Sequence, residues 1–95
     1  MEKPKNKIIQ KDISKYRAIT EKALKMVKKS ITSGKEKEAK EIIEMVECYL
    51  SDSNHFEKNK DLVNAFGAVY YAHGWLDCGA RLKIFNVTDN TLFAV

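Results

Sequence analysis

Beyond Pro4 the chain contains no proline, and its apolar residues recur every three or four positions. Proline is the residue that interrupts helices most strongly, so its absence leaves long helices uninterrupted. Spacings of three and four place side chains on one face of a helix. Four glycines are also few for a chain of β-strands, which needs many turns. Together these features predict an all-α fold.

The first helix is predicted from about Lys11 to Thr32 and the second from about Lys35 to Leu50. Ser33-Gly34 separates them, because glycine tolerates the left-handed conformation at a helix end. The second helix can continue to Glu57, since Asp52 and Phe56 keep its helical phase. The apolar stripe of the first helix consists of Ile13, Tyr16, Ile19/Thr20, Ala23/Leu24, Val27 and Ser30/Ile31, and that of the second of Ala39, Ile42/Ile43, Val46 and Tyr49/Leu50.

The third helix is predicted from about Leu62 to Ile84, with Asp61 as its N-cap and Asn86 ending it. A row of small residues lies along it: Ala65, Ala68, Ala72 and Gly79. Small side chains let another helix approach closely, which places this helix at the centre of the bundle. Each glycine inside a helix costs roughly 1 kcal/mol relative to alanine, so Gly67, Gly74 and Gly79 are expected to gain something in packing.

The predicted architecture is an antiparallel up-down bundle of three long helices with a docked C-terminal tail. Residues 1–10 are charged and are expected to form a flexible basic arm, which leaves residues 11–95 as a single domain. The last residues are unusually apolar for a chain terminus, and disordered tails are usually polar. We therefore expect the tail to dock through Val87, Leu92, Phe93 and Val95.

Charge is distributed unevenly along the chain. Residues 1–29 carry ten Lys/Arg and three Asp/Glu, whereas residues 30–95 carry seven and ten. Four lysines, Lys11, Lys15, Lys22 and Lys29, share the polar face of the first helix. Such a basic face can bind nucleic acid or an acidic partner, although a solvated lysine-rich face is the commoner interpretation.

The two cysteines are interpreted as small core residues in a reducing cytosol, because two cysteines are too few for a disulfide scaffold. Cys48, His55, His73 and Cys78 together suggest a zinc site, but they form no Cys-x-x-Cys or His-x₃-His pair, and His73 and Cys78 diverge around the helix. No metal site is predicted. No apolar run reaches the ~18–20 residues of a membrane span, and no signal peptide is recognisable. A cytoplasmic protein without a membrane partner is expected.

The stretch "YYAHGWLDCGARL", residues 70–82, concentrates the side chains that carry chemistry. His73, Asp77 and Arg81 follow one another at helical spacing, and Tyr70 lies one turn before them. One interpretation is a binding strip, with Arg81 for an anion and His73 oriented by Asp77. The other is structural, with an Asp77–Arg81 ion pair or with Asp77 capping a neighbouring segment. Trp75 is either an exposed anchor for a partner or, more commonly for tryptophan, mostly buried.

No catalytic residue or cofactor is assigned. No serine or cysteine has a base in phase with it, since His73 and Cys78 lie about 140° apart around a helix. Neither phosphate-binding glycine pattern, G-x-x-x-x-G-K or G-x-G-x-x-G, occurs. An RNA-recognition motif with interleaved aromatic residues is also missing. The sequence therefore favours a non-enzymatic role.

Residues 49–85 resemble an archaeal family known only as domain of unknown function 357. The resemblance rests on Tyr49, Asp52, Phe56, Asp61, Tyr71, Ala72, His73, Gly74, Trp75, Leu76, Asp77, Gly79, Arg81 and Leu82. The chain departs from the family pattern at Ser53 and Cys78, where alanine is usual, and at Asn59-Lys60, where glycine is usual. The resemblance extends over residues 11–95 and implies a compact bundle of long helices. It implies no activity.

The function predicted from these features is that of a non-enzymatic binding module that self-associates. Its expected partner is a second copy of the chain, in a homodimer, or another protein. Three helices with this many aromatic residues can leave an apolar face that needs a partner. The alternative, from another class, is a protein that handles nucleotides or RNA through the basic first helix and Arg81.

Overall fold

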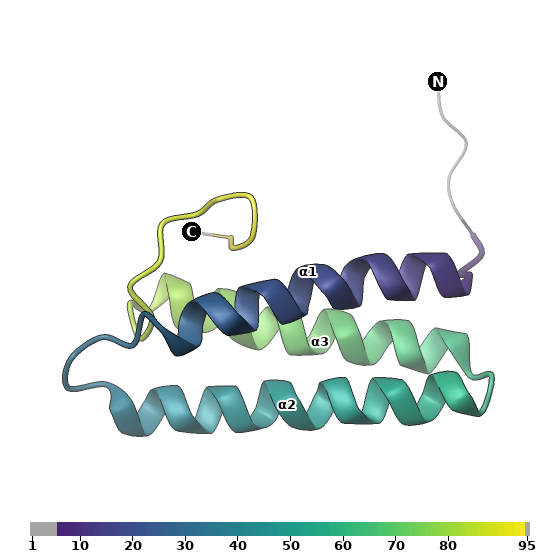
Figure 1. Ribbon diagram of the computed structural model, residues 1–95, viewed down its shortest axis with the longest axis horizontal. Coiled ribbons are helices and arrows are strands. Elements are labelled where there is room, and N and C mark those ends of the chain that lie inside the picture. The colour runs from purple at the N-terminus through teal and green to yellow at the C-terminus, as the bar shows by residue number, and fades with distance from the viewer. Residues whose placement is uncertain (1–5, 95) are drawn as a thin grey trace.

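The computed structural model describes residues 6–94, which form three helices followed by a tail. The helices are α1 (Gln10–Lys28), α2 (Glu36–Lys58) and α3 (Leu62–Arg81). α1 and α3 run in the same direction and α2 runs opposite to them (Figure 1). α3 packs extensively against both other helices, whereas α1 and α2 meet over a smaller area. The predicted all-α class and the up-down arrangement are confirmed.

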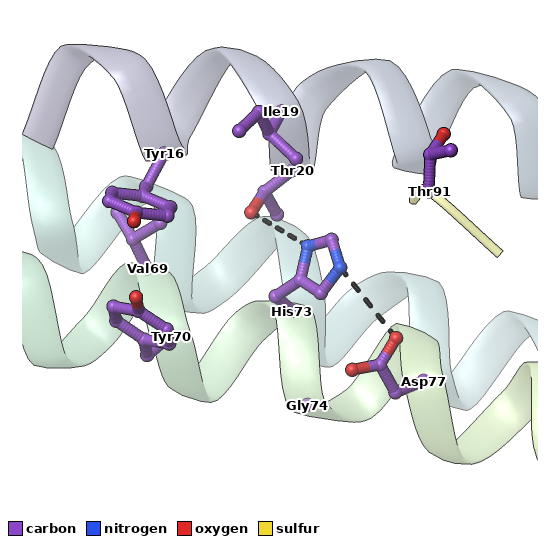
Figure 2. Close-up of a pocket in the computed structure, with 9 residues that line it drawn as sticks. All are labelled: Tyr16, Ile19, Thr20, Val69, Tyr70, His73, Gly74, Asp77 and Thr91. Atoms are coloured by element: carbon purple, nitrogen blue, oxygen red, sulfur yellow. Dashed lines mark hydrogen bonds and ion pairs between the residues drawn. The ribbon is translucent and has the colours of Figure 1, made fainter. Parts of the chain in front are cut away.

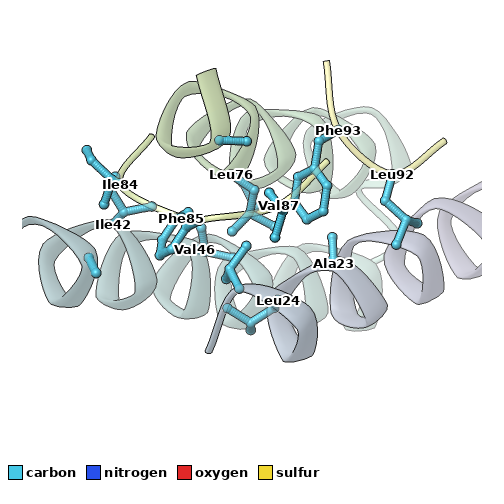
Figure 3. Close-up of a cluster of buried hydrophobic side chains, with 14 of the residues drawn as sticks. Ala23, Leu24, Ile42, Val46, Leu76, Ile84, Phe85, Val87, Leu92 and Phe93 are labelled. Atoms are coloured by element: carbon cyan, nitrogen blue, oxygen red, sulfur yellow. The ribbon is translucent and has the colours of Figure 1, made fainter. Parts of the chain in front are cut away.

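The core lies between the helices at the end where the tail crosses the bundle. The tail contributes Phe85, Val87, Leu92 and Phe93, all buried against the helices (Figure 3). Because these side chains complete the core, the expectation that the tail docks is correct for the described residues. Val95, which was also expected to dock, lies outside them, and so do residues 1–5 of the expected arm. Residues 6–9 have no regular secondary structure.

α1 ends at Lys28, four residues before the predicted Thr32. Residues 30–32 instead pair with the segment that comes after α3. The Asn86 amide donates to the Ser30 carbonyl at 2.6 Å, the Thr32 amide donates to the Ile84 carbonyl at 3.0 Å, and Ile31 forms an antiparallel bridge with Phe85. Ser33-Gly34 therefore does not end the helix, although Gly34 has a φ of 87° in the loop between α1 and α2.

Lysines occupy the left-handed position just after both α2 and α3, with φ of 63° at Lys60 and 62° at Lys83. After α3 the Lys83 amide donates to the Ala80 carbonyl at 3.2 Å and the Ile84 amide to the Gly79 carbonyl at 2.9 Å. This pair of bonds is a Schellman motif, and an equivalent pair closes α2. α3 accordingly ends at Arg81, before the predicted Ile84, while α2 reaches Lys58, one residue beyond the predicted extension.

The start of α3 agrees with the sequence. The Asp61 carboxylate accepts a hydrogen bond from the Asn64 amide at 3.2 Å, as expected of an N-cap. At the same end of the bundle, a buried Ser53 hydroxyl donates to the Ala65 carbonyl at 2.7 Å and accepts from Arg17 Nη2 at 2.8 Å. Arg17 also pairs with Glu57 at 2.7 Å. Ser53 thus ties all three helices together.

Gly79 is the glycine that close packing requires. A Cβ built on it would lie 2.5 Å from Cε2 of Phe85 and 3.2 Å from Cδ1 of Ile42. A Cβ at Gly67 or Gly74 would have no neighbouring atom within 4 Å. The prediction that all three glycines gain in packing is therefore wrong for these two, because they lie on the exposed side of α3.

Cys48 and Cys78 are free and exposed, so their interpretation as core residues is wrong. Each lies two positions from a buried residue, Val46 and Leu76, and two helical positions rotate a side chain by about 200° to the opposite side. No helix within residues 6–94 combines the length and the apolar character that crossing a membrane would require.

Candidate functional site

His73 on α3 connects α1 and the C-terminal tail. Its Nε2 lies 2.6 Å from the Leu92 carbonyl oxygen, and its Nδ1 lies 3.0 Å from the Thr20 hydroxyl. A carbonyl can only accept, so Nε2 carries a proton and donates it to Leu92. In the neutral ring Nδ1 then accepts from Thr20, which is only 1% exposed. Both ring nitrogens are therefore engaged within the protein.

Asp77 lies one turn beyond His73 and holds the end of the tail. Its Oδ1 accepts from the Ala94 amide at 2.9 Å and lies 3.6 Å from His73 Nε2. The expected ion pair between Asp77 and Arg81 is absent from the described residues, and Arg81 is exposed without an ion-pair partner there. The structural alternatives for Asp77 were an ion pair with Arg81 and the capping of a neighbouring segment. The structure shows the second, because Asp77 accepts from Ala94 in the tail.

Figure 2 shows the hollow beside this strip, between α1 and α3, with a volume of about 440 Å³. It is lined by Tyr16, Ile19, Thr20, Val69, Tyr70, His73, Gly74, Asp77 and Thr91. The lining is mostly apolar, and its imidazole and carboxylate are bonded to Thr20 and to the tail. Trp75 and Arg81 do not line it. Of the five candidate binding residues, the structure thus brings Tyr70, His73 and Asp77 together and leaves Trp75 and Arg81 outside the hollow.

Tyr70 belongs to an aromatic cluster at the α1 side of α3. Its ring centroid lies 5.2 Å from that of Tyr16 and 4.8 Å from that of Phe66. A hydrogen bond with Tyr16, followed by partial desolvation, raises the pKa of the Tyr70 phenol above its ordinary value. The cluster leaves half of Tyr70 open to solvent.

Trp75 lies on the other side of α3, toward α2, and is partly buried against the core. Tyr71 lies one turn before Trp75 on α3, with its ring centroid 6.5 Å from that of Trp75 and 4.6 Å from that of Tyr49 on α2. Desolvation and the neighbouring Tyr71 raise the pKa of Tyr49. Tyr49 and Tyr71 were not among the predicted site residues.

The exposed side of α3, which we call the outer face of α3, is largely apolar, and Asn64 and Arg81 are the polar residues exposed on it. Val63 is 71% exposed, Tyr70 51%, Tyr71 55% and Leu82 62%. Between them lie the exposed residues Gly67, Gly74 and Cys78. Sequence reasoning did not single out this surface, because it considered only the buried phase of the helix. The repeat of 63, 67, 70, 74, 78 and 82 would have revealed it, since these positions form a second helical stripe.

The four lysines of the basic face, Lys11, Lys15, Lys22 and Lys29, are all exposed, as a polar helix face requires. The ammonium of Lys15 lies 5.7 Å from the Tyr16 ring centroid, within the range of a cation–π contact. Lys22 is near the tail, where its charge helps to lower the pKa of Asp89. No group of three His, Cys, Asp or Glu side chains in the described chain is arranged to hold a metal ion.

Residues 15–85 match the sequence profile of a protein family described as protein of unknown function, DUF357. The chain belongs to this family. The matched region covers all of α2 and α3, so it includes the His73–Asp77 strip and the outer face of α3. The membership of this family that residues 49–85 predicted is thereby confirmed. No curated protein and no solved structure matches the chain.

Proposed function

We propose that the chain is a non-enzymatic interaction module that self-associates through the outer face of α3. The observation that carries the proposal is the exposure of Val63, Tyr70, Tyr71 and Leu82 along one side of a helix whose other side is the core. An apolar helix face is normally buried against another element. Contiguous apolar surface of this kind marks an interaction site in soluble proteins.

The state of the polar strip supports a role without catalysis. His73 and Asp77 bond to Thr20, Leu92 and Ala94, so their hydrogen-bonding capacity stabilises the docked tail. A general base needs a free nitrogen or oxygen within reach of the proton that it removes, and neither ring nitrogen of His73 is free. The strip in this arrangement positions the tail beside α3, and the outer face remains available for a partner.

Light scattering at micromolar concentration tests the proposal. The unmodified chain should have the mass of a dimer or larger species, and Cys78→Glu should convert it to a monomer, because a charge would be desolvated in the interface. Ser51→Glu, which adds the same charge at an exposed position of α2, is the control and should leave the mass unchanged. Circular dichroism should show both variants folded. A monomeric unmodified chain at high concentration would contradict the proposal.

The alternative function, binding of nucleotides or RNA, is supported by the exposure of the four lysines and of Arg81. Binding of this kind releases counterions, so its affinity falls steeply as salt rises. Titration of mixed-sequence RNA at several salt concentrations, with the unmodified chain and with a Lys15→Glu, Lys22→Glu variant, tests it. An absence of binding at low salt would remove this alternative.

A further inference from the structure

The three helices carry very different charges. α1 contains six Lys/Arg and two Asp/Glu, α2 contains three and seven, and α3 contains one of each. The net charges are therefore +4 on α1, −4 on α2 and zero on α3. Since α3 packs against both of the others, a neutral helix lies between a basic one and an acidic one.

Both charged helices border the outer face of α3. On the α1 side, two lysines, Lys7 and Lys15, and one carboxylate, Asp12, line a hollow together with Tyr16, Phe66 and Tyr70. On the α2 side, Glu38 and Glu41 line a hollow with Trp75, Cys78 and Leu82. A third, almost wholly apolar hollow between them is lined by Tyr70, Tyr71, Gly74, Trp75 and Cys78. Across this surface the side chains thus change from basic through apolar to acidic.

A second copy of the chain complements this surface in one of two symmetric arrangements. Homodimers use two-fold symmetry, and two faces can be stacked by an axis along the helices or across them. An axis along the helices places α1 of each copy over α2 of the other, so opposite charges meet. An axis across the helices places α1 over α1 and α2 over α2, so like charges meet. Opposite charges attract and like charges repel across the same separation.

We propose that two copies pack outer face to outer face with their α3 helices parallel, each basic α1 opposite the acidic α2 of the other copy. The inference rests on the proposed function, because it specifies the geometry of the self-association. In this dimer the apolar stripe is excluded from water and both charged borders are paired. Electrostatic complementarity of this type selects the orientation of partners more than it adds affinity.

The two ends of the outer face distinguish the arrangements. Val63 and Leu82 are nineteen positions apart on α3 and its C-cap, which at 1.5 Å per residue is about 28 Å. In the parallel dimer each residue lies near its own counterpart in the second copy. In the dimer with its axis across the helices, the two α3 helices are antiparallel, and Val63 of one copy lies near Leu82 of the other.

Crosslinking reads this difference directly. Val63→Cys and Leu82→Cys are prepared separately in a Cys48→Ser, Cys78→Ser background, mixed, and treated with a bis-maleimide spanning about 10 Å, the distance between packed helices. Mass spectrometry then separates 63–63, 82–82 and 63–82 products by mass. We expect both like products and no mixed product. A predominantly mixed product, or a dimer that gives no product, would overturn the parallel arrangement while self-association stands. A chain that light scattering shows to be monomeric would overturn both proposals.

Charge reversal gives a second, independent measurement. Lys15→Glu should weaken dimerisation roughly tenfold, because in each copy an acidic side chain would then face the acidic α2 of the other copy. Adding Asp52→Lys to the same chain should restore it, because Asp52 lies beside Tyr49, which meets Tyr71 at the end of α3 where Lys15 of the other copy would lie. Unchanged dimerisation in the first variant, or no recovery in the second, would contradict the pairing of α1 with α2.

Discussion

At the scale of single residues, Gly79 shows most clearly that one absent methyl group sets the packing of α3. The Phe85 ring occupies the space that a Cβ at this position would need. Gly79→Ala should therefore lower the free energy of unfolding by about 1–2 kcal/mol, because overpacking typically costs ~1–3 kcal/mol and improved helix propensity returns only part of it.

Gly67→Ala is the matched control for Gly79→Ala, since a Cβ there meets nothing. It should raise the free energy of unfolding by up to about 1 kcal/mol through helix propensity alone. Urea denaturation measures both variants. The account of Gly79 would be wrong if the two alanines changed stability in the same direction.

Asp77 and Arg81 lie one turn apart along α3, yet the structure gives them different roles. Asp77→Ala removes the acceptor for the Ala94 amide and should cost about 1 kcal/mol, the net value of a typical hydrogen bond. Arg81→Ala should change stability by no more than about 0.5 kcal/mol, as exposed substitutions usually do. Denaturation midpoints, together with amide exchange at Ala94, measure the difference. An equal loss in both variants would point instead to an ion pair between them.

At the scale of elements, the bodies and starts of the helices could be predicted from the sequence, whereas the C-terminal ends of α1 and α3 could not. Periodicity depends only on residues within the helix. The sequence therefore predicts the buried stripe of α1, which includes Ile13, and that of α2, which includes Val46. The ends depend on residues outside the helix. Lys60 and Lys83 occupy positions at which glycine is the usual signal, and α1 stops because residues 30–32 pair with a segment more than fifty positions away. Neither cause is visible in a local pattern.

The tail is the element whose docking should respond to acid. The Asp89 carboxylate accepts from the Thr91 hydroxyl at 2.6 Å, from the Thr91 amide at 2.8 Å and from the Leu92 amide at 3.3 Å. These bonds lower the pKa of Asp89 below its ordinary 3.8. A lowered pKa stabilises the folded tail above about pH 3.8, and this stabilisation is lost as the pH falls through the folded-state pKa.

An acid titration monitored by NMR at the Leu92 amide measures this response. We expect a transition below pH 3.8 in the unmodified chain and its disappearance in Asp89→Asn, which cannot titrate. The same acid transition in both proteins would show that another carboxyl group holds the tail.

At the scale of the whole molecule, the sequence indicated which residues share a face but not which faces the fold would leave open. α3 has one buried stripe through Ala65, Ala72 and Leu76 and an exposed one through Tyr70 and Leu82, and both are apolar. The helical period predicts which residues share a face, but it does not predict which face packs against the rest of the protein. The same limit applies to the candidate site. The sequence places His73 and Asp77 one turn apart on the same helix. The partners of the His73 ring, Thr20 and the Leu92 carbonyl, come from segments distant in sequence.

The antiparallel bridge between Ile31 and Phe85 makes assembly of the domain depend on the order in which the chain is synthesised. α1 and α2 leave the ribosome well before Phe85, Val87, Leu92 and Phe93, which complete the core between the helices. Closing so long a loop is slow, because its entropy is lost before the contact contributes anything. Until the tail emerges, the nascent helices therefore carry uncovered apolar stripes, and the core is complete only once residues 85–93 have left the ribosome. A ribosome stalled before residue 85 would present the very surface that chaperones recognise.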